Sequence, residues 1–130
     1  MRTIKQPLIA VCVALTCVWG AQASAMTRAE YKAAEDRIGA DYKAAKQRCD
    51  GLSGNTKDVG EKEAKGNEKI AKPELEAQYK PSDKNRAKIA EAKADAAYDV
   101  AREKCDELAG NAKDVCQKDA KAAHSAAKTS

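Results

Sequence analysis

Two segments of the chain, 42–65 and 98–121, carry the same residue pattern at an offset of 56 positions. They are identical at 13 of their 24 aligned positions. The identities include Cys, Leu, Gly, Asn and Val as well as the common Ala and Lys, and chance would not align the rarer residues in one register. The pattern therefore predicts a single structural unit that is used twice.

In both copies a Gly-Asn pair separates two segments rich in helix-forming residues. Glycine favours the left-handed conformation that ends a helix, and asparagine is a good cap for the next one. The expected fold is all-α, with two tandem αα-hairpins in an elongated up-and-down arrangement. Residues 26–80 are expected to form the first hairpin, and residues 81–130 the second hairpin with a frayed C-terminal tail. The predicted turn residues are Gly54, Asn55, Gly110 and Asn111.

The N-terminus has the pattern of a cleaved signal peptide spanning residues 1–25. Arg2 and Lys5 precede a short apolar run, and small residues then lead to a cleavage site between Ala25 and Met26. The apolar run of about 12 residues is shorter than the roughly 20 that a membrane span needs, so no stable membrane anchor is expected. The predicted location is periplasmic or secreted.

The mature part, about 105 residues, is poor in large apolar side chains. It contains nine Leu, Ile and Val residues together, 23 Ala and neither Phe nor Trp. Such a composition argues against an α/β enzyme or a β-sandwich. It is also compatible with disorder, although disorder usually accompanies a high net charge. With 22 basic and 20 acidic residues the mature part is nearly neutral, so no nucleic-acid binding is expected from bulk charge.

Four helices are predicted from their start and stop signals. The first has a capping box in Thr27 and Glu30. One of its faces carries a stripe that it can bury, made of Tyr31, Ala34, Ile38, Tyr42, Ala45 and Cys49. The expected ranges are from the Thr27 cap to about Leu52, from about Thr56 to Tyr79, from about Lys84 to Ala109, and from about Ala112 to Ala127.

The second helix is predicted to be the least secure. Pro73 lacks the amide hydrogen that would bond to the Lys69 carbonyl, so a kink or break is expected around residues 69–72. Acid–base pairs at a spacing of four should support this helix by about 0.2–0.5 kcal/mol each. These pairs are Asp58 with Lys62, Glu61 with Lys65, Glu68 with Lys72, and Glu76 with Lys80.

The mature cysteines predict one disulfide and one unpaired thiol. Cys105 lies five residues before Gly110 and Cys116 five residues after Asn111, so the pair is placed symmetrically about a turn. A bridge closing so short a loop should stabilise the fold by about 3 kcal/mol. In the first copy of the repeat, Cys49 corresponds to Cys105, but the residue that corresponds to Cys116 is Gly60. Cys49 is therefore open to three interpretations: a buried inert thiol, a disulfide with another chain, or a site for small thiols.

No catalytic, cofactor-binding or metal-binding residue is predicted. The carboxylates are dispersed, and no His, Arg or second thiol is placed by the sequence to activate Cys49. His124, the only histidine, is interpreted as a solvated helix residue instead of a metal ligand. Tyr42 and Tyr98 are assigned to the core instead of a ligand site.

The run from Tyr98 to Lys121, with its partial copy from Tyr42 to Lys65, resembles a family of small exported proteins of proteobacteria. Its members carry one or two blocks of Cys, a few residues and Leu-x-Gly-Asn-x-Lys-Asp-Val-Cys before a helix rich in Lys and Ala, and they are described as cell-envelope biogenesis or TolA-like proteins. The chain departs from this pattern at Gly60 and Pro73. The resemblance implies no catalytic residues.

The sequence favours a non-enzymatic, exported structural or protein-interaction protein of the bacterial cell envelope. Its expected partner is an envelope protein or a second copy of the chain, with Cys49 as the candidate residue for a covalent link. Two alternatives remain. One is a periplasmic thiol redox protein that uses Cys49. The other is a chaperone-like or envelope-stress binding module whose mixed-charge helices hold unfolded clients or lie on an anionic surface.

Overall fold

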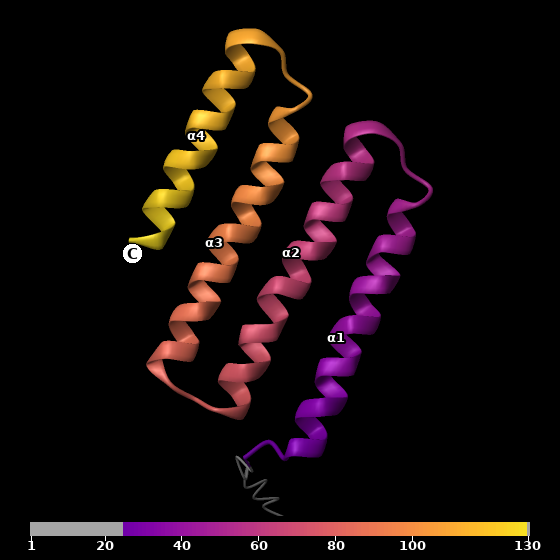
Figure 1. Cartoon of the computed structure of the whole chain (residues 1–130), viewed down its shortest axis with the longest axis vertical. Helices are drawn as coiled ribbons and strands as arrows, with labels where there is room; N and C mark the ends of the chain where they lie inside the picture. Colours follow the sequence, from indigo (N-terminus) through magenta and orange to yellow (C-terminus); the bar gives the residue numbers. More distant parts are fainter. Residues whose placement is uncertain (1–24, 130) are drawn as a thin grey trace, which may run out of the picture.

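The computed structural model describes residues 25–129, which form four α-helices joined by short loops (Figure 1). Consecutive helices run in opposite directions, and each packs on its neighbour in the chain. The predicted all-α, up-and-down fold is confirmed. Residues 1–24 of the predicted signal peptide, 1–25, lie outside the described residues. The helices are α1 (Arg28–Cys49), α2 (Gly54–Tyr79), α3 (Asp83–Cys105) and α4 (Gly110–Lys128).

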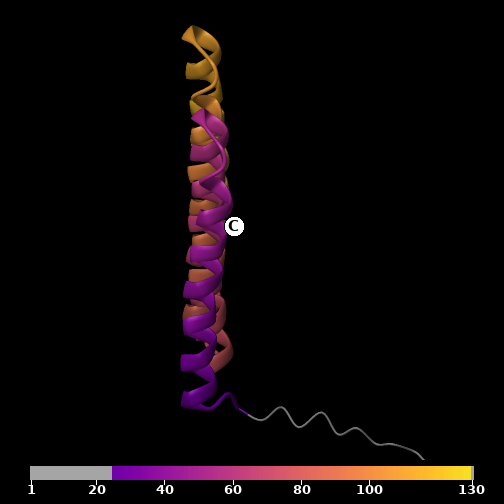
Figure 2. The ribbon, with the colours of Figure 1, turned by 90° about the vertical axis from the view of Figure 1, so that its right-hand side faces the viewer.

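The four helices lie in a single layer. Seen from its edge, the molecule is one helix thick along its whole length (Figure 2). Within residues 25–129, α1 contacts only α2 and α4 contacts only α3, so α1 and α4 are the two edges of the layer. A typical domain packs two layers around one core. This layer instead leaves both of its broad faces open.

Local signals in the sequence set where the helices begin. The Thr27 backbone N–H donates to the Glu30 carboxylate at 2.7 Å, and the Glu30 N–H donates to Thr27 Oγ1 at 3.2 Å, which confirms the predicted capping box. At the start of α3, Ser82 Oγ accepts from the Asn85 N–H at 3.1 Å. The Asn85 side chain in turn donates to the Lys80 carbonyl at 2.8 Å and closes the loop between the hairpins.

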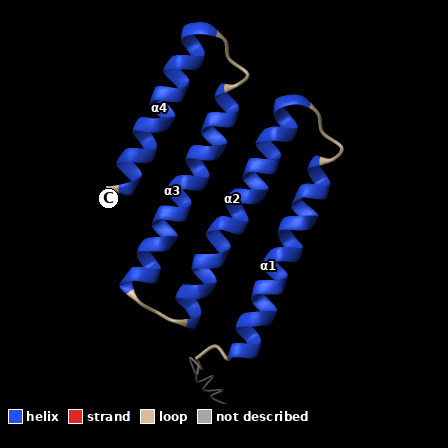
Figure 3. Ribbon diagram, in the orientation of Figure 1, coloured by secondary structure: helices blue, strands red, loops and turns tan. Residues whose placement is uncertain are grey.

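The hairpin loops are residues 50–53 and 106–109, drawn in tan in Figure 3. Here the structure differs from the prediction, because the preceding helices end before they reach the glycines. In each loop the leucine N–H bonds to the carbonyl of the last helical cysteine, as in Leu52 to Cys49 at 2.9 Å. Gly54 (φ 57°) and Gly110 (φ 56°) adopt the predicted left-handed conformation, but they open the following helix instead of ending the preceding one.

The predicted break at Pro73 does not occur, since α2 is continuous from Gly54 to Tyr79. Packing on α3 holds both sides of the proline in place. Before it, the Lys69 ammonium lies 3.5 Å from Asp95, and after it Glu74 pairs with Lys93 at 2.9 Å. Contacts with α3 therefore flank the proline on both sides within a continuous helix.

Only one of the four predicted acid–base pairs within α2 forms in the described chain, Glu68 with Lys72 at 2.8 Å. Two of the other charges have partners on α3 instead, and Lys65 pairs with Glu68 within α2. Lys62 pairs with Glu103 at 3.7 Å, and Glu76 pairs with Lys88 at 3.2 Å. These ion pairs are half-exposed, and such pairs contribute about 0–1 kcal/mol each. They connect helices more than they support a single one.

The core is thin and is built from small residues. The stripe predicted for α1 does face α2, but Cys49 is its only fully buried member and the others are half-buried. Tyr42 and Tyr98 are also only half-buried, with Lys65 above one ring and Arg102 above the other, so their assignment to the core was wrong. The buried hydrophobic residues are Cys49, Ala64, Leu75, Ala92, Ala94, Ala96 and Cys105.

Candidate functional site

The predicted disulfide is confirmed. Cys105, at the end of α3, is bonded to Cys116 in α4 with the two Cα atoms 5.7 Å apart. Cys105 is fully buried, so the bridge also forms part of the core of the second hairpin. It fixes the two helices side by side, close to the loop that joins them.

Cys49 occupies the corresponding position in the first hairpin as a buried free thiol. It is 5% exposed, and its thiol donates to the Ala45 carbonyl at 3.4 Å. A Cβ atom built on Gly60 would lie 2.8 Å from the Cys49 sulfur, so this sulfur fills the space left by the missing side chain. Of the three interpretations of Cys49, the geometry fits the buried thiol best, because a partner could reach it only if the hairpin opened.

A polar cluster centred on Asp95 joins three helices. His124 Nε2 lies 2.6 Å from Asp95 Oδ1, and the same carboxylate receives Lys69 from α2 and Lys128 from α4. The hydrogen bond from His124, together with the bond from Lys128 and the charges of both lysines, lowers the pKa of Asp95 from 3.8 to about 2. The His124 ring also stacks on Tyr98 with centroids 4.6 Å apart.

This cluster corrects the interpretation of His124 as a solvated residue. The side chain is one-fifth exposed and ties the end of α4 to α3. The tail that was expected to fray is helical as far as Lys128, whose ammonium pairs with Glu91 and Asp95. Sequence reasoning missed the cluster because Asp95 and His124 lie 29 residues apart, with no local signal that would join them.

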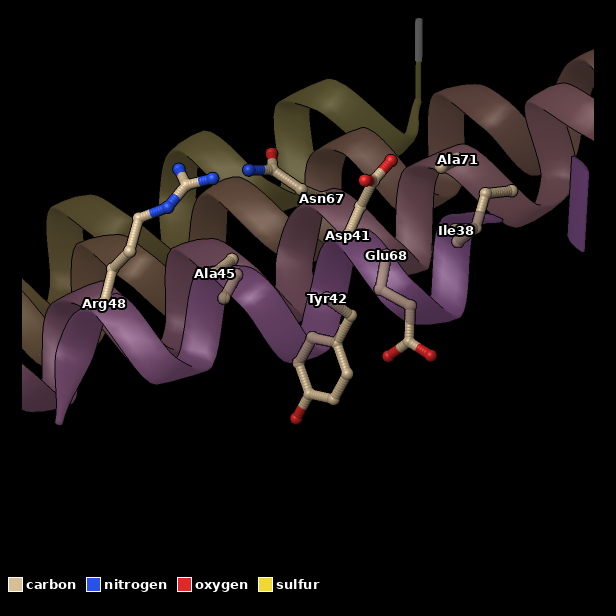
Figure 4. Close-up of a pocket in the computed structure, with 9 residues that line it drawn as sticks. Ile38, Asp41, Tyr42, Ala45, Arg48, Asn67, Glu68 and Ala71 are labelled. Atoms are coloured by element: carbon tan, nitrogen blue, oxygen red, sulfur yellow. The ribbon is translucent and has the colours of Figure 1, made fainter. Parts of the chain in front are cut away.

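A shallow groove of about 300 Å³ lies between α1 and α2. Figure 4 shows its polar side chains turned to opposite sides, with Tyr42 and Glu68 on one side and Arg48 and Asn67 on the other. Glu68 accepts hydrogen bonds from Lys65 at 3.0 Å and Lys72 at 2.8 Å, which lower its pKa. Because Glu68 is already paired, it is poorly placed to serve as a general base.

A second groove, of about 450 Å³, lies between α2 and α3 and is mainly apolar. Its floor is formed where Gly66 meets Ala96, and the charged side chains Glu63, Lys93 and Lys104 stand at its rim. The apolar residues that line it are Gly66, Ile70, Ala96, Ala97, Val100 and Ala101. This surface suits an apolar partner flanked by charges better than it suits a reacting small molecule.

The asparagines predicted to cap the hairpin turns do not do so. The caps of α2 and α4 are Ser53 and Ala109, and neither makes a side-chain cap bond. The Asn55 side chain instead donates to the Glu103 carbonyl at 2.8 Å and links the tip of the first hairpin to the second hairpin. Asn111, its counterpart 56 residues later, is exposed.

Within residues 25–129, no helix has an apolar stretch long enough to cross a membrane. The same residues contain no group of three or more His, Cys, Asp or Glu side chains that could hold a metal ion. Comparisons with protein-family models, with curated proteins and with solved structures found no match to the chain. The geometry of the chain itself therefore carries the functional argument.

Proposed function

We propose that this chain is a non-enzymatic, exported structural or protein-interaction protein of the bacterial cell envelope. The observation that carries the proposal is the single layer of helices, with both broad faces open and a disulfide bracing the second hairpin. Much of the surface of such a single layer takes no part in its thin core. Such a surface serves contact with other macromolecules.

The disulfide also supports export. Stable disulfides form in oxidising compartments such as the periplasm and are rare in the cytosol. The Cys105–Cys116 bridge fits the N-terminal pattern that predicts secretion, and it fits the resemblance to small exported proteobacterial proteins. Cys105 is fully buried in the hairpin core, which favours a structural role for the bridge over a catalytic one.

The alternatives differ in how well the geometry supports them. A thiol redox role would need an accessible thiolate, and Cys49 is 5% exposed. A chaperone-like binding role is supported by the apolar groove between α2 and α3, which has charged residues at its rim. We therefore retain this binding role as the second candidate, since it is a form of protein interaction.

The proposal can be tested by expressing the whole chain in a Gram-negative bacterium and isolating the periplasmic fraction. We expect a protein that begins at Met26, with Cys105 joined to Cys116 and with Cys49 reduced. Amine-reactive crosslinking in intact cells should join lysines of the broad faces to a small set of envelope proteins or to a second copy. Weaker crosslinking is expected for the Cys105→Ser/Cys116→Ser variant.

Two results would contradict the proposal. One is a chain that keeps residues 1–25 and remains in the cytoplasm with all its thiols reduced. The other is turnover of a substrate that is lost in Cys49→Ala, because the proposal gives this thiol no chemical role.

A further inference from the structure

The face of α2 that packs on α3 reappears on α4, at positions 56 residues later in the chain. On α2, the Asn55 side chain donates to the Glu103 carbonyl at 2.8 Å, and Glu63 pairs with Lys104 at 3.8 Å. Gly66 lies against Ala96, since a Cβ atom built on it would be 3.0 Å from the Ala96 Cβ. The corresponding residues on α4 are Asn111, Asp119 and Ala122.

We call this set on α4, together with Val115, the outer face of α4. Helical periodicity, about 100° per residue, places all four residues within an arc of about 80° on one side of the helix. This side is opposite His124, whose side chain bonds to Asp95 of α3, so it is turned away from α3. Val115 is 47% exposed, whereas its counterpart Val59 on α2 is half-buried. Asn111 has no hydrogen bond from its side chain within the described chain. The outer face of α4 therefore has the residues of a helix-docking surface without an occupant among the four helices.

The matching surface lies on α1 at the opposite edge of the layer. At the same offset of 56 residues, α1 corresponds to α3: Ala40 is equivalent to Ala96, and Arg48 is equivalent to Lys104. Both residues of α1 are exposed. Ala40 lies on the outer side of α1, and Arg48 lies on the flank of α1 that also borders the α1–α2 groove. The outer side of α1, with this flank, is thus the counterpart of the α3 surface that α2 binds.

We infer that the outer face of α4 docks α1 of a second copy of this chain, in the way that α2 docks α3. Asp119 would then pair with Arg48 of the second copy, as Glu63 pairs with Lys104. Asn111 would donate to the backbone carbonyl of Gln47 of the second copy, as Asn55 donates to that of Glu103. Because the acceptor is a backbone carbonyl, the difference between the Gln47 and Glu103 side chains does not affect this bond. Ala122 would lie against Ala40.

This contact uses different surfaces on the two copies, so each copy keeps one free edge for the next. Contacts of this kind generate open arrays or closed rings. The inference rests on the proposed structural or interaction role and names its partner. It extends the pattern of the chain, in which each hairpin adds to the edge of the previous one (Figure 1).

The contact between copies should be weaker than the one between α2 and α3. Ala122 carries a Cβ atom where Gly66 has none, which keeps the two helices farther apart. Lys69 pairs with Asp95 and Asp99, but Ser125 and Gly39 stand at two of the corresponding positions and cannot form an ion pair. We therefore expect weak association, with a dissociation constant of about 10–100 µM.

The direct test mixes two variants of the whole exported chain, Ala40→Cys and Ala122→Cys, under mild oxidation. The expected product is a disulfide between position 40 of one chain and position 122 of the other, identified by peptide mass spectrometry. Crosslinks that join only 40 to 40 or 122 to 122 would overturn the inference. Absence of crosslinked dimer would do the same.

Sedimentation velocity over a range of concentrations provides the second test. The disulfide-bonded chain should associate reversibly, and both Val115→Lys and Asp119→Arg should weaken association about tenfold. Combining Arg48→Asp with Asp119→Arg restores opposite charges and should recover most of that loss. The matched control is Asp114→Arg, which makes the same charge change on α4 beside Tyr98 and Arg102 and should leave association unchanged.

All variants alter exposed side chains, and circular dichroism should show the wild-type helix content. A chain that stays monomeric at about 500 µM overturns the inference. Association that Val115→Lys leaves unchanged also overturns it. A monomeric chain that still crosslinks to another envelope protein would refute self-docking alone and leave the proposed function standing, whereas substrate turnover dependent on Cys49 would refute the proposed function.

Discussion

Replacing Gly60 by cysteine should create a second disulfide in the first hairpin. A Cβ atom built on Gly60 lies 3.9 Å from the Cys49 Cβ and 2.8 Å from its sulfur. Native disulfides have Cβ–Cβ separations of about 3.5–4.5 Å, so the new thiol would be within bonding reach without movement of the backbone. The substitution would give the first hairpin the bridge that the second already has.

The magnitude follows from the length of the loop that the bridge closes. A crosslink between positions 49 and 60 closes about 12 residues, and the chain-entropy relation gives about 3 kcal/mol of stabilisation. For a chain of this size, that corresponds to a rise in melting temperature of roughly 14 °C. With the bond reduced, the order should reverse, because two sulfurs would then occupy space that now holds one.

The assay is thermal unfolding followed by circular dichroism, with thiols counted under denaturing conditions. Oxidised Gly60→Cys should contain no free thiol in its mature part and should melt above the wild type. The control is Gly60→Cys/Cys49→Ala, which has the new cysteine without its partner and should gain nothing from oxidation. If oxidised Gly60→Cys still contains two reactive thiols, the geometric argument is refuted.

Three further predictions follow from the described contacts. Asp95→Asn should lower the free energy of unfolding by about 1–2 kcal/mol at pH 7. Because the fold lowers the pKa of Asp95 to about 2, the stabilisation by this carboxylate is present above pH 5 and is lost as the pH falls towards 2. Urea melts of the wild type and the variant should therefore converge near pH 2. Reduction of the Cys105–Cys116 bridge should lower the unfolding free energy by about 3 kcal/mol, and an unchanged urea midpoint would contradict this. Cys49 should react with iodoacetamide at least about a hundredfold more slowly in the native chain than in guanidinium, since the reaction requires local opening of the first hairpin. Equal rates would show that the thiol is accessible in the native chain.

The sequence predicted the features that depend on residues close together in the chain. The capping box of Thr27 and Glu30 formed as expected, because both of its hydrogen bonds lie within one helical turn. The bridge between Cys105 and Cys116 was also predictable, since a hairpin turn brings positions at equal distances from it face to face. Helix-forming composition, symmetric spacing and a twice-used turn were sufficient to predict an all-α hairpin fold.

Tertiary packing decided which of several possible partners each charged or polar group takes. Lys62 had a local partner in Asp58 but pairs with Glu103 on the next helix, and Asn55 bonds to α3 instead of capping its own helix. His124 is held by Asp95 across 29 residues. Local spacing assigns nearly equal energy to such alternatives, and the choice among them depends on the distance and register of neighbouring helices. Those are set by the contact of small side chains along a single layer, which no short stretch of the sequence specifies.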